Sequence, residues 1–195
     1  MSNLDRVHPA LADGIRAKGY ESLTPVQEAV LDPEIANADL LVSAQTGSGK
    51  TVAFGLAMAE NLLEGAAFAF ADIPRALIIA PTRELAMQVQ RELQWLYGPT
   101  GAVIAGAVGG MDARAERRAL ERGAHIVVGT PGRICDHMRR GALDLSALRV
   151  AVPGAPEALT LFNTHRNSRE PAKVAIARAE AAPRLQTREY DACLA

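Results

Sequence analysis

A glycine-rich octapeptide constrains the fold more than any other stretch of the chain. It runs from Ala44 to Thr51, reads AQTGSGKT, and lies between an apolar run of strand length and a helical stretch. Glycines let backbone N–H groups turn inward around phosphate oxygens, and the N-terminus of the next helix adds donors and a favourable dipole. The octapeptide therefore predicts a phosphate-binding loop, although the strict pattern has Gly at its first position. The alternative is a glycine-rich turn without a ligand.

Most of the chain alternates between strands and helices. Apolar runs predict strands at residues 39–44, 76–80, 102–108, 125–129 and 148–152. Helical stretches lie between most of them, at residues 51–63, 83–96, 113–122 and 133–140. Short apolar strands that alternate with helices are typical of βαβ units. We therefore predict an α/β fold with a parallel sheet that is covered by helices on both faces.

Both ends of the chain differ from this alternation. Before it, the pattern predicts a short amphipathic helix that ends at Gly19 and a second helix that begins at Thr24-Pro25. After it, prolines interrupt a polar stretch. We therefore expect one domain over residues 1–152 and a divergent or truncated tail over residues 153–195.

Composition limits the class of protein. The 195 residues suit one domain, and 49% hydrophobic residues suffice for a core. Lys and Arg number 21 and Asp and Glu 22, so the net charge of −1 excludes a generally basic coat protein but permits a local basic face. Two cysteines are too few for a disulfide framework or a metal cluster. The polar start and the absence of an apolar run of ~18 residues predict a cytoplasmic protein without a membrane span.

Four further motifs accompany the phosphate loop. They are Gly-Tyr at residues 19–20 with Thr-Pro-Val-Gln at 24–27, PTRELA at 81–86, Gly-Gly at 109–110 and TPGR at 130–133. Their order and spacing over about residues 4–152 resemble the first RecA-like domain of DEAD-box ATP-dependent RNA helicases. The resemblance implies a RecA-like fold, ATP and Mg²⁺ as ligands, and ATP-dependent RNA unwinding as the activity of the family.

The resemblance also implies an adenine site. Gln27 is similar to the glutamine of the family's Q motif, which reads adenine because an amide both donates and accepts hydrogen bonds. Tyr20 is similar to the aromatic residue that stacks on adenine. Two departures imply looser packing: no aromatic precedes Tyr20, and Leu23 stands where proline is usual. The alternatives are a solvent-facing Gln27 and a core Tyr20. The full expected ATP site is Tyr20, Gln27, Thr46, Gly47, Ser48, Gly49, Lys50 and Thr51.

Two residues of this set carry the expected catalytic roles. Lys50 would reach the β- and γ-phosphates, and the hydroxyl of Thr51 would bind Mg²⁺. Thr51 is therefore also the expected metal ligand.

The remaining motifs imply contacts with the RNA backbone. Hydroxyl, guanidinium and backbone N–H groups at helix N-termini bind phosphates, and paired glycines allow close approach of the backbone. Such contacts are independent of base sequence and sensitive to salt, and they suit single-stranded or duplex RNA. Plain helix capping is the alternative for the two Thr-containing motifs. The expected RNA-binding residues are Pro81, Thr82, Arg83, Gly109, Gly110, Thr130, Pro131, Gly132 and Arg133.

Other charged and aromatic residues have structural interpretations. The charge run at residues 113–122 predicts a solvated helix face, with a basic RNA-facing stripe as the alternative. We interpret Trp95 and Tyr97 as residues that pack the end of the helix at 83–96. The spacing of His8, His125, His137 and His165 is not that of metal ligands.

The catalytic box of the family is absent. The family has Leu-Asp-Glu-Ala-Asp directly after a strand like that at residues 148–152, where this chain reads PGAPE at 153–157. The carboxylates of that box hold Mg²⁺ and orient the attacking water. We expect the second RecA-like domain to be missing as well, so we predict a catalytically impaired domain. The alternatives are a non-enzymatic nucleotide- or RNA-binding module and a non-functional gene fragment, and a deletion, a frameshift or a divergent splice would each explain the tail.

Overall fold

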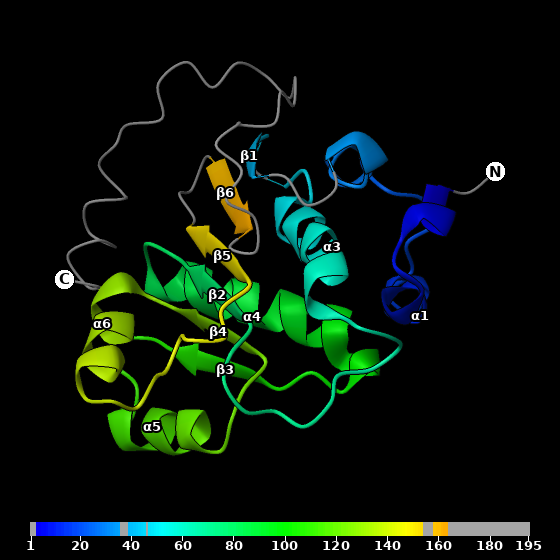
Figure 1. The fold of residues 1–195 in the computed structure, drawn as a ribbon. Coiled ribbons are helices and arrows are strands. Elements are labelled where there is room, and N and C mark those ends of the chain that lie inside the picture. The colour runs from blue at the N-terminus through cyan, green and yellow to red at the C-terminus, as the bar shows by residue number, and fades with distance from the viewer. Residues whose placement is uncertain (1–2, 36–38, 46, 154–157, 164–195) are drawn as a thin grey trace.

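A six-stranded sheet between two layers of helices forms the body of the molecule (Figure 1). The computed structural model describes residues 3–35, 39–45, 47–153 and 158–163. The strands are β1 (Leu40–Ser43), β2 (Ala76–Ile79), β3 (Ile104–Ala107), β4 (Ile126–Gly129), β5 (Val150–Pro153) and β6 (Ala158–Asn163). Their order across the sheet is β1-β6-β5-β2-β4-β3.

The described residues form six α-helices and three short 3₁₀ helices, some before the first strand and the others between strands. The α-helices are α1 (Pro9–Ala17), α2 (Pro25–Ala29), α3 (Lys50–Leu62), α4 (Arg83–Tyr97), α5 (Ala113–Glu121) and α6 (Pro131–Arg139). The 3₁₀ helices are η1 (Asn3–Arg6), η2 (Pro33–Ile35) and η3 (Gly98–Thr100). Each strand and helix that the sequence predicts is present within a few residues of its expected bounds, and the segment between α3 and β2 carries no regular element. No helix within the described ranges has the length and apolar character needed to cross a bilayer.

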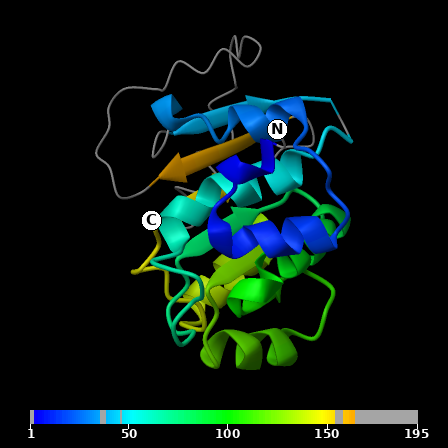
Figure 2. The same cartoon turned by 90° about the vertical axis from the view of Figure 1, so that its right-hand side faces the viewer.

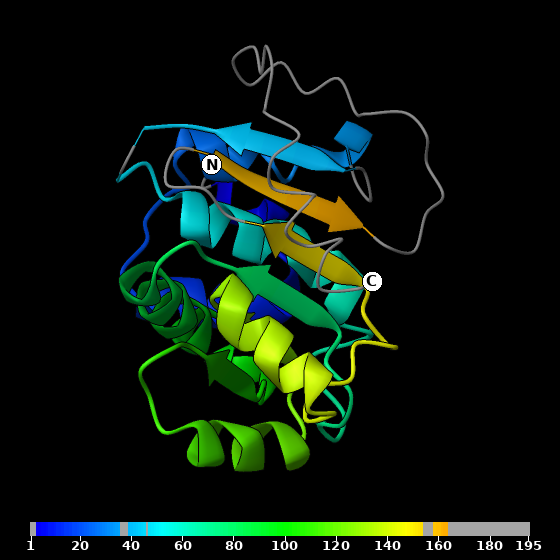
Figure 3. The ribbon, with the colours of Figure 1, turned by 90° about the vertical axis from the view of Figure 1, so that its left-hand side faces the viewer.

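The helices cover both faces of the sheet, as the alternating pattern predicts. Figure 2 shows α1 in front of α3, and Figure 3, from the opposite side, shows α6 across the near face with α3 behind the sheet. Successive residues of a strand point to opposite faces. In β2, Ala76 and Ile78 therefore join the larger core under α1, α3 and α4, and Leu77 joins the smaller core under α5 and α6. The α/β prediction is confirmed.

Close packing between α3 and α4 fixes the larger core. Gly55 of α3 lies against α4, where a Cβ atom would come within 2.6 Å of the Leu96 side chain. The hydroxyl of Tyr97 donates a hydrogen bond of 2.6 Å to the Gly55 carbonyl oxygen, and Tyr97 is fully buried. Burial raises the pKa of Tyr97 far above its usual value. The expected packing role of Tyr97 at the end of α4 is therefore confirmed.

Strand β6 is the element that the sequence analysis did not anticipate. It lies between β1 and β5 and runs antiparallel to both, so β1 runs in the same direction as β5. Only residues 154–157 connect β5 to β6. A parallel neighbour needs a crossover of about a dozen residues, whereas a short link permits only antiparallel pairing. The predicted parallel sheet is thus confirmed for β2, β3, β4 and β5, which pair in parallel, whereas β1 joins the sheet only through its antiparallel pairing with β6.

Substitution of a residue inside β6 tests its interior position in the sheet. Thr160 lies opposite Leu41 of β1. Thr160→Pro removes a backbone N–H from a strand that pairs on both sides, and interior strands tolerate proline poorly, so we expect a loss of about 1–3 kcal/mol in the free energy of unfolding. Urea unfolding measures this loss. Thr160→Val keeps the N–H and should unfold close to the parent chain, and an equally small effect of proline would contradict the pairing.

Candidate functional site

The phosphate loop joins the end of β1 to the start of α3. Gly47 and Gly49 adopt left-handed backbone conformations, with φ of 81° and 85°, that side-chain-bearing residues rarely adopt. Lys50, the first residue of α3, folds its side chain back over the loop. Its Nζ donates hydrogen bonds to the carbonyl oxygens of Ala44 and, at 2.9 Å, of Gln45. The lysine is therefore already positioned above the loop, whereas Thr46 lies outside the described residues.

Helix α2 is fastened to this loop by two side chains. Gln27 is fully buried, its Oε1 accepts from the backbone N–H of Thr24 at 3.0 Å, and its Nε2 donates to the carbonyl oxygen of Gly49 at 3.4 Å. The Thr24 hydroxyl donates to the carbonyl oxygen of Ser48 at 2.9 Å. The solvent-facing interpretation of Gln27 is wrong, because the amide connects α2 to the loop. Contact between Gln27 and adenine stays a prediction.

Tyr20 lies at the rim of a cavity next to the loop. Its ring stacks on Trp95, with 6.0 Å between ring centroids, and the Lys18 ammonium lies 5.3 Å from the centroid of the Trp95 ring. Burial raises the pKa of Tyr20 and the negative charge of Glu92 raises it further, whereas a hydrogen bond with Gln27 acts in the opposite direction. Tyr20 is half-buried and packs against the edge of the larger core. Its aromatic face is already engaged by Trp95.

The cavity itself lies between the phosphate loop and α4. It has a volume of about 290 Å³, and its walls include Tyr20, Gly49, Lys50, Thr51, Gln88 and Glu92. Two of the expected nucleotide-binding groups, the Tyr20 ring and the Lys50 ammonium, therefore share one concave surface.

The chemistry of the loop fits a phosphate group. The buried Ser48 hydroxyl has no hydrogen-bond partner within the described part of the chain. Buried hydroxyls normally have partners, so this one indicates a ligand oxygen. The loop also supplies a lysine and a helix N-terminus, which bind anions. For Mg²⁺ the loop offers the Thr51 hydroxyl, and the described residues contain no group of three or more His, Cys, Asp or Glu side chains placed to hold a metal ion.

The three expected RNA-binding motifs lie in one row at the same edge of the sheet. Ile79 of β2 and Ala107 of β3 both pair with Gly129 of β4. PTRELA begins two residues after Ile79, Gly-Gly begins two residues after Ala107, and TPGR follows Gly129 directly. Parallel pairing therefore brings together all three motifs, which are far apart in the sequence.

Arg83 and the Gly-Gly turn are in direct contact. Gly110 has φ of 78°, and a Cβ atom there would lie 2.3 Å from Nη1 of Arg83. A side chain at position 110 would therefore displace the guanidinium from its present place. Thr82 caps α4, because its hydroxyl oxygen accepts from the N–H of Leu85 at 3.2 Å. The capping interpretation is confirmed for Thr82, and the phosphate contact stays a prediction.

Arg133 has a partner that the sequence analysis missed. Thr130 precedes α6, Pro131 begins the helix, and Gly132 has open space around its Cα. The Arg133 Nε lies 3.5 Å from Oε2 of Glu116, and only 15% of the Arg133 side chain is exposed. Glu116 belongs to the charge run that predicted a solvated face, and for this residue the prediction is wrong, because it is only 8% exposed. Its i, i+4 spacing to the buried Leu120 was the available signal.

The sequence model of the DEAD/DEAH box helicase family matches residues 24–152. The ATP-dependent RNA helicase RhlB of Aliivibrio salmonicida is 40% identical over 148 residues, which are 75% of this chain and 34% of RhlB. The maize chloroplastic DEAD-box ATP-dependent RNA helicase 3A is 40% identical over 141 residues, which are 71% of this chain and 19% of that protein. The chain belongs to the DEAD/DEAH box helicase family and spans about a third or less of the length of these relatives.

Solved structures agree with this assignment. A DEAD box protein from Methanococcus jannaschii matches with a TM-score of 0.65 and 35% identity, over 75% of this chain and 39% of that one. Dbp5 of S. cerevisiae bound to RNA and ADP BeF3 matches with a TM-score of 0.64 and 28% identity, over 78% of this chain and 37% of that one. The RecA-like α/β fold and the family resemblance are therefore confirmed.

The two glycines of the phosphate loop offer a matched pair of substitutions. Both have similar positive φ, but a Cβ at Gly47 meets nothing within 4 Å, whereas one at Gly49 would lie 2.4 Å from Nε2 of Gln27. Gly47→Ala should lower the free energy of unfolding by the conformational cost alone, about 1–2 kcal/mol. Gly49→Ala should lower it further, because it also displaces the buried amide. Urea unfolding of both variants checks this order, which equal losses would contradict.

Proposed function

We propose that the chain is the ATP- and RNA-binding first domain of a DEAD-box RNA helicase, over residues 1–152, with impaired hydrolysis and a divergent tail over 153–195. The observation that carries the proposal is the shared sheet edge. The phosphate loop follows β1, the RNA motifs follow β2, β3 and β4, and these strands all run in the same direction. Ligands of open α/β sheets bind beyond the carboxyl ends of the strands.

The residues of the loop perform the binding step. When nucleotide arrives, Lys50 exchanges the carbonyl oxygens of Ala44 and Gln45 for phosphate oxygens. Backbone N–H groups at Gly47 and Gly49, which have the positive φ of such loops, would bind the same anion, and the Ser48 hydroxyl would gain the partner that it lacks. Thr51 would hold Mg²⁺, which neutralises phosphate charge when it is bound. Gln27 would contact the base by giving up its hydrogen bond with Thr24 or with Gly49, and Tyr20 would contact it through the ring face that is turned away from Trp95.

Hydrolysis needs carboxylates that this sequence does not supply at the expected place. No Asp-Glu-Ala-Asp tetrapeptide occurs in the 195 residues, and β5 ends in Pro153. Phosphoryl transfer depends on metal positioning and on orientation of the attacking water. The chain therefore binds ATP and turns it over slowly. A non-enzymatic module that binds nucleotide and RNA is the second candidate, and the same missing carboxylates favour it.

RNA binding would use the backbone of the nucleic acid. Thr82 and Arg83 at the start of α4 and the Gly-Gly turn form one contiguous surface, and Arg133 lies on the next motif of the row. Dbp5, whose structure with RNA and ADP BeF3 resembles this fold, supports the assignment by analogy. Contacts of this kind do not read bases and weaken with salt.

Nucleotide binding without turnover is the expected behaviour of the purified chain. A fluorescent ATP analogue should bind, and Lys50→Ala should weaken binding by about 10- to 100-fold, since one charge-assisted contact contributes about 1.5–3 kcal/mol. Arg16→Ala removes one positive charge from the exposed surface of α1 and should leave the affinity within about twofold. RNA-stimulated release of phosphate that Lys50→Ala abolishes would show that the chain is a competent ATPase.

RNA binding should depend on Arg83 and on salt. Arg83→Gln removes the guanidinium that contacts Gly110, so we expect about 3- to 10-fold weaker binding of a fluorescein-labelled oligouridylate. The slope of log affinity against log salt should fall in magnitude by about 0.7, the value for one phosphate contact on a single strand. Fluorescence anisotropy at several KCl concentrations measures both. Arg91→Gln changes an exposed arginine further along α4 and serves as the control, and equal effects of the two variants would contradict a specific role of Arg83.

A further inference from the structure

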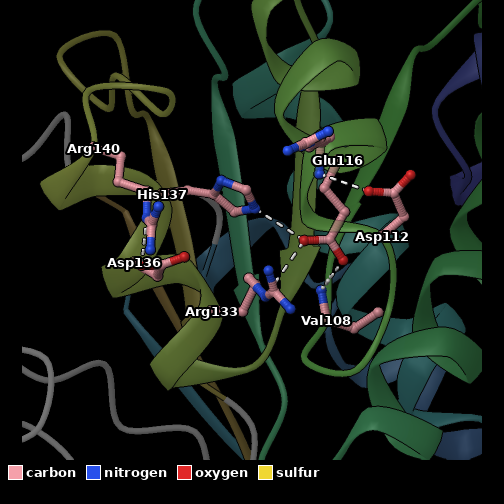
Figure 4. Close-up of polar contacts among 8 residues, drawn as sticks. Val108, Asp112, Glu116, Arg133, Asp136, His137 and Arg140 are labelled. Carbon is pink, nitrogen blue, oxygen red and sulfur yellow. Dashed lines mark hydrogen bonds and ion pairs between the residues drawn. The ribbon is translucent and has the colours of Figure 1, made fainter.

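A buried carboxylate joins two of the motifs at the sheet edge, although it belongs to neither. Figure 4 shows Glu116 between the turn that follows β3 and the start of α6. Oε1 accepts from the backbone N–H of Val108 at 3.0 Å, directly before the Gly-Gly turn. Oε2 faces Nε2 of His137 at 2.9 Å and Nε of Arg133 at 3.5 Å. Three parts of the chain therefore meet at one side chain.

Burial makes this arrangement costly unless every partner is in place. Glu116 is 8% exposed and His137 only 2% exposed. A buried charge must be paired and hydrogen-bonded, and removal of one partner leaves an uncompensated charge. An ionised carboxylate only accepts hydrogen bonds, so the imidazole donates from Nε2. The second ring nitrogen, Nδ1, has no partner among the described residues, so the ring could carry its proton there only if the group facing Nε2 were itself a donor.

The contact with Glu116 engages only one side of the Arg133 guanidinium. It uses Nε, and neither Nη atom has an ion pair or hydrogen bond within the described ranges. A guanidinium fork binds phosphate through two parallel N–H groups. A carboxylate that contacts Nε therefore orients the guanidinium and leaves its Nη–H groups available to an anion.

Exposed charges on the same helix behave differently. Glu121 of α5 pairs with Arg117 at 2.7 Å, and both side chains are about half exposed. Such surface pairs contribute little to stability and move freely. Glu116 alone on α5 connects the helix to both neighbouring motifs in the described structure.

We propose that Glu116 is a positioning residue of the RNA-backbone interface. It fixes the position of the Arg133 guanidinium relative to the turn at Gly109-Gly110, so that both bind neighbouring phosphates of one RNA backbone. This inference rests on the proposed function, because the backbone that these groups bind is RNA.

Glu116→Gln isolates the contact with Arg133. A glutamine oxygen still accepts from Val108 N–H, and its NH₂ group can donate to His137 in the other tautomer. The same NH₂ group cannot pair with the Nε–H of Arg133, since both are donors. We therefore expect a folded variant that binds the oligouridylate about 3- to 10-fold more weakly than the parent, with a salt slope lower by about 0.7, like Arg133→Gln. The double variant should bind no more weakly than Arg133→Gln alone.

Glu121→Gln is the matched control, because it removes the same charge from the same helix, and it should keep the parent affinity. The proposal is overturned if Glu116→Gln, folded as judged by thermal unfolding, binds as tightly as the parent or more tightly. It is also overturned if the losses of Glu116→Gln and Arg133→Gln add in full.

A spectroscopic measurement separates this inference from the proposed function. The ¹⁵N–¹H signal of the Arg133 Nε, assigned by its absence in Arg133→Gln, should be protected from exchange in the parent chain and lose this protection in Glu116→Gln. An unchanged signal would overturn the claim that Glu116 positions the Arg133 guanidinium, whatever the result of the RNA-binding measurements. If Arg83→Gln and Arg133→Gln both leave RNA affinity unchanged, the proposed RNA function fails. Loss of protection in Glu116→Gln would then still support the positioning of Arg133.

Discussion

Hydrogen bonding between β2, β4 and β3 places Ile79, Gly129 and Ala107 in one row across the sheet. Because all three strands are parallel, the segments that leave them emerge on the same side, and each segment carries one of the motifs. A shift in register by one residue would exchange the inward and outward faces of a strand and break both hydrophobic cores. The burial of three consecutive residues in β2, and the full burial of β4, therefore protects the alignment of the functional loops.

Buried polar side chains fix the loops and helices that surround the strands. Gln27 fastens α2 to the phosphate loop, and Glu116 fastens α5 and α6 to the turn after β3. His125 does the same for the segment after α3, because its Nδ1 accepts from the N–H of Val103 and its Nε2 donates to the Ala69 carbonyl oxygen. This arrangement requires a neutral ring, in agreement with the lowering of the His125 pKa by burial. In each case a loop that could not form a core of its own is fixed by a satisfied polar group.

The segment after β5 affects both the direction of the next strand and the presence of the catalytic carboxylates. In a parallel sheet, the next strand follows a long crossover, and in this family the catalytic carboxylates lie at its start. Here residues 154–157 replace that connection, so β6 returns directly and pairs antiparallel with β5 and β1. The same short connection that reverses the strand leaves no room for an Asp-Glu box and a following helix. The impaired hydrolysis that we propose and the reversal of β6 would therefore have one physical origin.

The sequence alone was sufficient for the α/β class, the element bounds and the phosphate loop, because periodicity and turn residues are local properties. It also indicated the motifs that define the family. It did not predict β6, whose direction depends on what lies between β5 and β1, or the burial of Gln27, which depends on how α2 meets the loop. Glu116 was misassigned because a charge run suggests solvent, and only the packing of α5 against β3 and α6 turned one of its carboxylates inward. Contacts between segments far apart in the chain decide such cases, and no local pattern records them.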